Sequence, residues 1–138
     1  MSILKRFEEI PHTADWSFRA FGADLPDLFA NAACALFALQ GARARDAAAA
    51  TARALELEAL DREALLVAWL SELLWLQETH HEAYPRIEIE SLTATTLRAR
   101  VFGVPLATLD KAIKAVTYHN LAIDQTADGW QAVVVVDV

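Results

Sequence analysis

The chain has 138 residues, is 55 % hydrophobic and carries a net charge of −7 at pH 7, which suits a single domain spanning residues 1–138. Its 12 Lys and Arg side chains do not cluster, and this disfavours a module that itself binds nucleic acid, because phosphate contacts need basic patches. No apolar run reaches the roughly 18–20 residues of a membrane span, and the single cysteine, Cys34, excludes an internal disulfide, so we expect a cytoplasmic protein.

The first part of the chain predicts two strands followed by a helix. Residues 5–10 suit a short strand, and residues 16–22 alternate with the period of a half-buried strand. Asp24 is a suitable N-cap for a helix, because its side chain can accept a backbone N–H. An apolar stripe with helical spacing then runs as far as Gly41, which is suited to a left-handed C-cap.

The middle of the chain predicts a loop, a strand and a second helix. Residues 42–54 are a low-complexity Ala/Arg stretch whose middle we interpret as a surface loop. Residues 51–60 alternate between apolar side chains and glutamates, which is typical of a strand with one solvated face. Asp61 is suited to cap a helix that runs to about His80. Because the apolar stripe of this helix is wide, we expect it to be the most buried element.

The last part of the chain predicts mainly strands. Alternating side chains predict three of them, at residues 87–90, 92–102 and 114–124. Residues 106–113 fit a short helix or an ordered loop. Asp128-Gly129 is a hairpin signal that would return the chain as an antiparallel neighbour of the preceding strand. The order of elements predicts an α+β fold, with two main helices packed on a mixed or antiparallel β-sheet.

The last six residues, VVVVDV, place a carboxylate at the end of an apolar strand. Four consecutive valines are typical of a strand buried on both faces, where an unpaired charge is costly. Asp137 and the terminal carboxylate of Val138 stand side by side there. Three explanations are open: the end frays into water, a Lys or Arg neutralises it, or a hard cation such as Ca²⁺ or Mg²⁺ binds its oxygens.

Two polar groups elsewhere could complete such a site. Asp15, in the stretch HTAD, either caps a local turn together with His12 and Thr13 or acts as a metal ligand or catalytic carboxylate. His119 is expected on the strand beside the last one, facing the sheet surface or a pocket. A stand-alone metal-dependent hydrolase would hold its metal with Asp15 and Asp137 and use His119 as acid and base.

Four stretches, in this order along the chain, resemble the archease family. They are IPHTADWSFRAFGADLPDLFANAACALFAL, DREALLVAWLSELLWL, KAVTYHNLAI and VVVVDV. The resemblance covers nearly the whole chain and implies a compact α+β domain. It also implies a non-enzymatic accessory protein for the RtcB-type RNA-splicing ligase, which promotes guanylylation and repeated turnover of that ligase and broadens its nucleotide use in tRNA splicing and RNA repair.

The resemblance also implies a metal site. Carried over residue by residue, its ligands are Asp15, Asp137 and Val138, with Ca²⁺ as the usual ion and Mg²⁺ or Mn²⁺ as substitutes. Further residues that could support the site or contact the partner are His12, Lys114 and His119.

Overall fold

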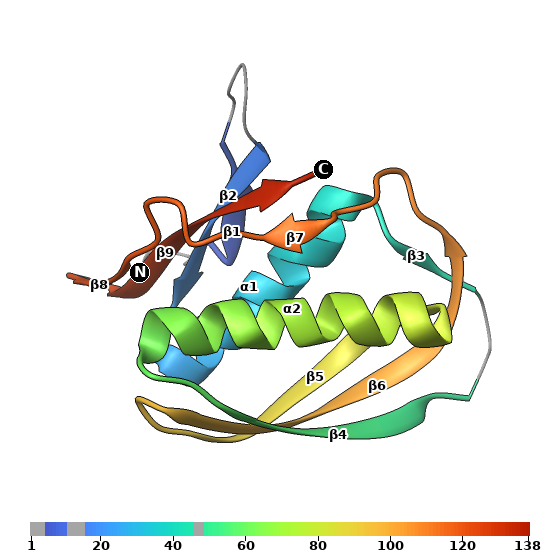
Figure 1. Cartoon of the computed structure of the whole chain (residues 1–138), viewed down its shortest axis with the longest axis horizontal. Coiled ribbons are helices and arrows are strands. Elements are labelled where there is room, and N and C mark those ends of the chain that lie inside the picture. The colour runs from blue at the N-terminus through green and yellow to red at the C-terminus, as the bar shows by residue number, and fades with distance from the viewer. Residues whose placement is uncertain (1–4, 11–15, 46–48) are drawn as a thin grey trace.

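A computed structural model of the protein describes residues 5–10, 16–45 and 49–138. Its elements, in chain order, are β1 (Phe7–Glu9), β2 (Trp16–Gly22), α1 (Leu25–Gln40), β3 (Arg43–Ala44), β4 (Thr51–Glu58), α2 (Arg62–His80), β5 (Glu82–Leu92), β6 (Thr96–Thr108), β7 (Ala115–Val116), β8 (Ile123–Thr126) and β9 (Gly129–Asp137) (Figure 1). The predicted α+β class with two main helices is confirmed, and the strand pairs are antiparallel.

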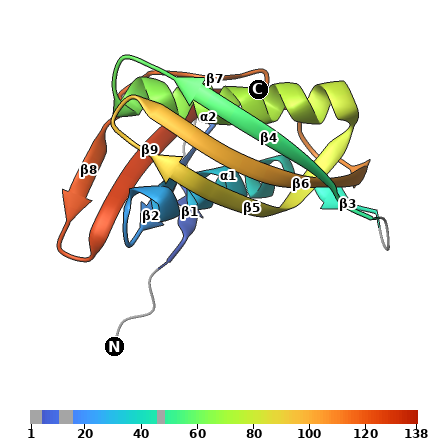
Figure 2. The same cartoon turned by 90° about the horizontal axis from the view of Figure 1, so that it is seen from below.

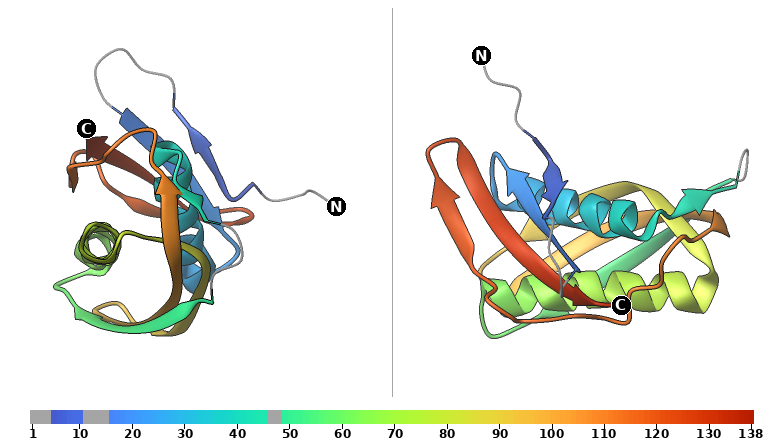
Figure 3. Two further views of the ribbon diagram at one scale, coloured as in Figure 1. Left: turned by 90° about the vertical axis from the view of Figure 1, so that its right-hand side faces the viewer. Right: turned by 90° about the horizontal axis from the view of Figure 1, so that it is seen from above.

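The strands form two sheets. In one, the order is β1-β2-β9, and both β7 and β8 pair with the free side of β9. In the other, the long β6 pairs with β3, β4 and β5. Helix α1 packs on β2 and β5, while α2 packs on β4, β5 and β7. Figure 2 shows β4, β5 and β6 in front of both helices, and Figure 3 shows α2 lying within the curve of this sheet.

Both predicted helices are confirmed with their caps. The Asp24 carboxylate accepts the Asp27 N–H at 2.8 Å, and Gly41, which has a φ of 63°, is the C-cap that follows α1. The Asp61 carboxylate accepts the Ala64 N–H at 2.8 Å at the start of α2. These caps satisfy backbone groups that the first and last helical turns leave without partners.

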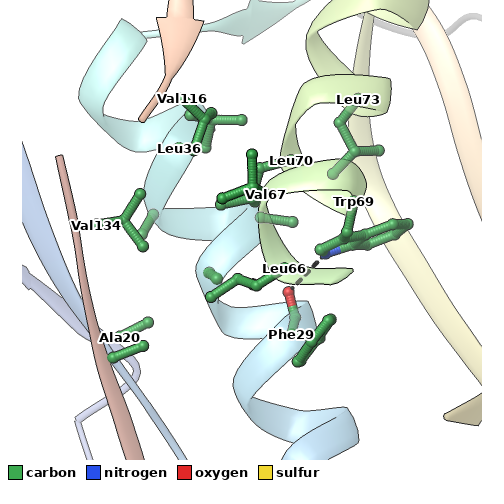
Figure 4. Close-up of a cluster of buried hydrophobic side chains, with 14 of the residues drawn as sticks. Ala20, Phe29, Leu36, Leu66, Val67, Trp69, Leu70, Leu73, Val116 and Val134 are labelled. Atoms are coloured by element: carbon green, nitrogen blue, oxygen red, sulfur yellow. Dashed lines mark hydrogen bonds between the residues drawn. The ribbon is translucent and has the colours of Figure 1, made fainter. Parts of the chain in front are cut away.

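The core lies where the two helices meet the sheets. The Trp69 side chain of α2 is fully buried, and its indole N–H donates to the Phe29 carbonyl of α1 at 2.9 Å (Figure 4). Leu66 and Leu70 of α2 lie beside it, and Val134 of β9 faces them from the sheet. This packing fixes β9 relative to both helices. Neither α1 nor α2, the helices of the described ranges, combines the length and apolarity of a membrane span.

The prediction of one strand over residues 92–102 is wrong. The chain turns after β5 and starts β6 at Thr96. The Thr93 side chain closes this turn by accepting the Thr96 N–H at 3.0 Å, and the Thr93 N–H donates to the Thr96 carbonyl at 2.9 Å. A turn held by threonine side chains lacks the Gly, Pro or Asn that usually mark one, so the alternation continues across it unbroken.

The prediction of one strand over residues 114–124 is also wrong. Strand β7 has two residues, and the chain then turns through Asn120, whose φ is 52°, before β8 begins. The hairpin between β8 and β9 is as predicted. For residues 106–113, β6 continues to Thr108 and an irregular loop follows, which excludes the helical alternative.

Candidate functional site at the end of β9

The end of β9 lies between β2 and β7. Trp16 of β2 is opposite Val136, and Ala115 of β7 is opposite Asp137. The Lys114 N–H donates to the Asp137 carbonyl at 2.7 Å. The main chain is therefore held as far as Asp137 and does not fray before it.

The two faces of β9 differ in burial. Val134 and Val136 lie in the core, whereas Val133 and Val135 on the other face are half-buried. The expectation of a strand buried on both faces is therefore wrong. Because side chains alternate along a strand, Asp137 continues the outer row and is exposed. Its carboxylate reaches water although the strand is held, so its charge costs little.

Two lysines of the loop before β7 lie near this end. The Lys111 Nζ lies 3.7 Å from the centroid of the Trp16 ring, a cation–π contact. Lys114 is exposed and precedes Ala115, which is opposite Asp137. Among the described residues, no Lys or Arg forms an ion pair with Asp137. The Asp137 carboxylate is therefore available to a ligand from solvent.

The other predicted site residues have different outcomes. His12 and Asp15 lie outside the described residues. His119 is exposed in the turn that follows β7, and its Nε2 lies 3.2 Å from the Asn120 Nδ2. The prediction that His119 lies on a strand beside β9 is wrong, because β7 ends at Val116.

The donor set suits a hard cation in its chemistry. Carboxylate oxygens are the ligands that Ca²⁺ and Mg²⁺ prefer, and Asp137 offers an exposed pair of them. Trp16, which follows Asp15 in the chain, pairs with Val136, which precedes Asp137. Within the described part of the chain, no three His, Cys, Asp or Glu residues converge on one point. The remaining proposed ligands are Asp15 and the terminal carboxylate of Val138. The residue Val138 is 40 % exposed.

A groove near this site was missed in the sequence. It has a volume of about 620 Å³ and lies between the C-terminal half of α2 and residues 106–115. The α2 wall includes Gln77 and four residues with the i, i+3, i+4, i+7 spacing of one helix face, namely Ser71, Leu74, Trp75 and Glu78. The tryptophan beside polar residues on that helix face was the sequence feature that could have indicated the groove. The opposite wall is irregular, so its sequence has no periodicity that would predict it.

Comparisons with known proteins agree over nearly the full length. The sequence profile of the archease protein family matches residues 7–138. Protein archease from Methanosarcina barkeri is 38 % identical over 143 residues, covering 97 % of each chain. Protein archease from Archaeoglobus fulgidus is 32 % identical over 146 residues, covering 96 % of this chain and 99 % of its own.

Two solved structures share the fold of this chain. The solution structure of Methanobacterium thermoautotrophicum protein 1598 aligns with a TM-score of 0.71 at 29 % identity, covering 98 % of this chain and all of that one. The crystal structure of an archease from Thermotoga maritima, described as a possible chaperone, aligns with a TM-score of 0.69 over 100 % of this chain and 99 % of its own. Its 20 % identity supports the fold alone. The family profile, the full-length relatives and the shared fold together establish that this chain belongs to the archease protein family.

Proposed function

We propose that this protein is a non-enzymatic activator of an RtcB-type RNA-splicing ligase. It promotes guanylylation and repeated turnover of the ligase in tRNA splicing and RNA repair, and it broadens the nucleotide use of the ligase. Family membership supports an accessory role. The observation that carries the proposal is the exposed Asp137 carboxylate, held at the end of β9 without an ion-pair partner among the described residues.

In this proposal, a divalent cation binds at the end of β9, which we call the metal-bearing end. Asp15, Asp137 and the terminal carboxylate of Val138 supply its oxygen ligands, with Ca²⁺ favoured over Mg²⁺ and Mn²⁺. The pairing of Trp16 with Val136 supports this set, because each of these residues is the chain neighbour of a proposed aspartate ligand. When bound, the cation supplies positive charge that offsets the repulsion between the carboxylates.

The charge of the whole protein suits such a partner. A net charge of −7 disfavours binding to RNA itself, whereas an enzyme that holds RNA presents basic surfaces. Complementary charge speeds the encounter of two proteins and suppresses wrong partners. The protein therefore reaches RNA through the ligase, not directly.

The stand-alone hydrolase has less support from the geometry. It needs His119 within hydrogen-bond reach of a group at the metal. Ala115 is opposite Asp137, and the chain runs away from that end as it continues toward His119. The His119 ring lies beside the Asn120 side chain in an exposed turn. We therefore do not propose this activity.

The proposal is tested by mixing the purified protein with the cognate ligase, GTP and divalent metal. Guanylylation of the ligase and multiple-turnover joining of RNA ends are measured with and without the protein. We expect both rates to rise, and Asp15→Ala or Asp137→Ala to remove the increase. Asp124→Ala is the matched control, because Asp124 is also an exposed aspartate and lies on β8. Equal rates with and without the wild-type protein would overturn the proposed function.

A further inference from the structure

Most charges on the outer face of the β4–β6 sheet are already paired with each other; Glu58 of β4 is exposed there without an ion-pair partner among the described residues. Glu56 pairs with Arg98, and Arg100 pairs with both Glu88 and Glu90. A surface that neutralises most of its own charges leaves a partner fewer charged groups to recognise. Figure 2 views the molecule from this side.

The groove beside α2 extends from the C-terminal end of this helix toward the end of β9. At one end the Leu106 N–H donates to the His81 carbonyl at 2.8 Å. At the other end the wall reaches Lys114 and Ala115, and Ala115 is opposite Asp137. Figure 1 shows β7 beside the end of β9. The groove therefore runs along α2 and finishes beside the candidate metal site.

The middle of the groove is apolar and aromatic. Trp75 is 56 % exposed, which is unusual for a side chain of this size, and its ring meets the His80 ring edge-on at 6.5 Å between centroids. Leu74 and Leu109 continue the apolar lining. A partly exposed tryptophan in a concave surface is the kind of residue that dominates binding energy at protein interfaces.

The charges of the groove lie toward its two ends. Glu78 lies toward the His81 end, and Lys114 lies at the end next to β9. Both side chains are exposed, and neither has an ion-pair partner among the described residues. An occupant that complements this pattern has a basic group at one end, an acidic group at the other and an apolar side chain between them.

We propose that this groove is the docking site for a segment of the partner ligase, an inference that rests on the proposed function. The segment inserts an apolar or aromatic side chain beside Trp75. A basic side chain of the segment contacts Glu78, and an acidic group contacts Lys114. A groove of this kind accepts an amphipathic segment through side-chain anchors. Because the groove ends beside Asp137, docking there brings the metal-bearing end to the ligase.

The test measures the affinity of the full-length protein for the cognate ligase by titration calorimetry. We expect Trp75→Ala and Glu78→Lys each to weaken binding by at least about tenfold, in line with interface hot spots. Leu60→Ala is the control, because Leu60 is 94 % exposed and lies outside the groove lining. Unchanged melting temperatures would show that the exposed positions were altered without loss of the fold.

A second measurement separates docking from activation. A saturating concentration of a groove variant restores the guanylylation rate, because docking is weakened while the metal-bearing end is intact. Saturation does not rescue Asp137→Ala. Amide hydrogen exchange should show protection in residues 71–81 and 106–115 when the ligase binds, and none on the outer face of β4–β6.

The two proposals fail in different ways. Wild-type affinity in both groove variants, or protection on the outer face of β4–β6 in place of the groove, overturns the docking inference while activation by the wild-type protein persists. A wild-type protein that neither binds nor activates the ligase overturns the proposed function, and the docking inference falls with it.

Discussion

Glu82 shows how one residue can be both buried and charged in this fold. Its carboxylate accepts two bonds from the Arg53 guanidinium, at 2.7 Å from Nε and 2.9 Å from Nη2. The side chains of Glu82 and Arg53 are 10 % and 25 % exposed. The hydrogen bonds from Arg53 hold the pKa of Glu82 below its ordinary value of 4.5, and burial next to Glu82 raises the pKa of Tyr84. A bidentate pair of this kind fixes the position of β4 relative to the start of β5.

The lowered pKa of Glu82 predicts a loss of stability in acid. A carboxyl group whose pKa is lowered by folding stabilises the protein above its unfolded pKa, and this contribution disappears as the pH falls through its folded pKa. We expect the free energy of unfolding to decline below about pH 4.5, and Glu82→Gln to remove this part of the decline. At pH 7, Glu82→Gln should cost about 1–3 kcal/mol, because Arg53 is left without its partner. Urea denaturation at pH 3 to 7 measures both.

Glu56→Gln is the matched control for that experiment. Glu56 pairs with Arg98 at 3.2 Å, but both side chains are largely exposed, and exposed pairs contribute little. The free energy of unfolding of Glu56→Gln should depend on pH as that of the wild-type protein does. If the Glu82→Gln variant shows the same pH dependence as well, the ion pair between Glu82 and Arg53 does not contribute as we describe.

At the scale of elements, the helices were predictable and the strand boundaries were not. A helix is specified by local signals, such as the apolar stripe between Asp24 and Gly41, which act whatever surrounds them. A strand depends on its partners. The alternation over residues 92–102 crosses a turn closed by Thr93, and the pattern over residues 114–124 crosses a turn at Asn120. Neither turn has a strong signal in the sequence.

The two helices are joined by a buried amide pair that offers a test at this scale. The Gln40 and Gln77 side chains donate to each other, at 2.8 and 3.0 Å. Removing one partner leaves the other buried without a bond, which costs about 1–3 kcal/mol, whereas removing both leaves no such group. We expect Gln40→Met and Gln77→Met each to destabilise the protein, and the double variant to be more stable than the sum of the two changes predicts.

A double-mutant cycle by urea denaturation measures this coupling. Leu36→Ala combined with Leu97→Ala serves as a reference for ordinary core losses, because both side chains are buried and neither carries a polar group. Strict additivity for the glutamine pair would contradict its role as a matched link between α1 and α2.

At the scale of the whole molecule, the candidate site depends on joining distant parts of the chain. The pairing of β2 with β9 makes Trp16 and Val136 neighbours, although nearly the whole sequence separates them. Pattern alone left Asp137 with three explanations, and the resemblance to the archease family supplied Asp15 as its companion. Only the α2 wall of the groove had a signal in the sequence, because its other wall is a loop that takes its shape from tertiary contacts.

A cation held between distant parts of the chain should stabilise the whole fold. Binding to the folded state alone adds about 2.7 kcal/mol at a ligand concentration of 100 times Kd, which raises the melting temperature by about 5–10 °C for a chain of this size. We expect Ca²⁺ to produce such a rise in calorimetry, and Asp137→Ala to abolish it. Asp124→Ala should keep it. Extra residues after Val138 should reduce it, because they convert the terminal carboxylate into an amide.

The placement of the cation is tested by comparing tags. The same short tag should leave the Ca²⁺ effect intact at the N-terminus and weaken it at the C-terminus. A melting temperature that does not respond to Ca²⁺, Mg²⁺ or Mn²⁺ would contradict the metal proposal and favour a protein-interaction domain without a metal.

The loop of residues 109–114 is tied to two parts of the fold. The N–H groups of Asp110 and Lys111 donate to the Gln40 carbonyl, and the Lys114 N–H donates to the Asp137 carbonyl. The same loop forms a wall of the groove. A segment seated in the groove and an ion at the end of β9 would therefore each restrict one shared loop. Thermodynamic linkage makes such coupling reciprocal. If the ion raises the affinity for the partner by a certain factor, the partner raises the affinity for the ion by the same factor.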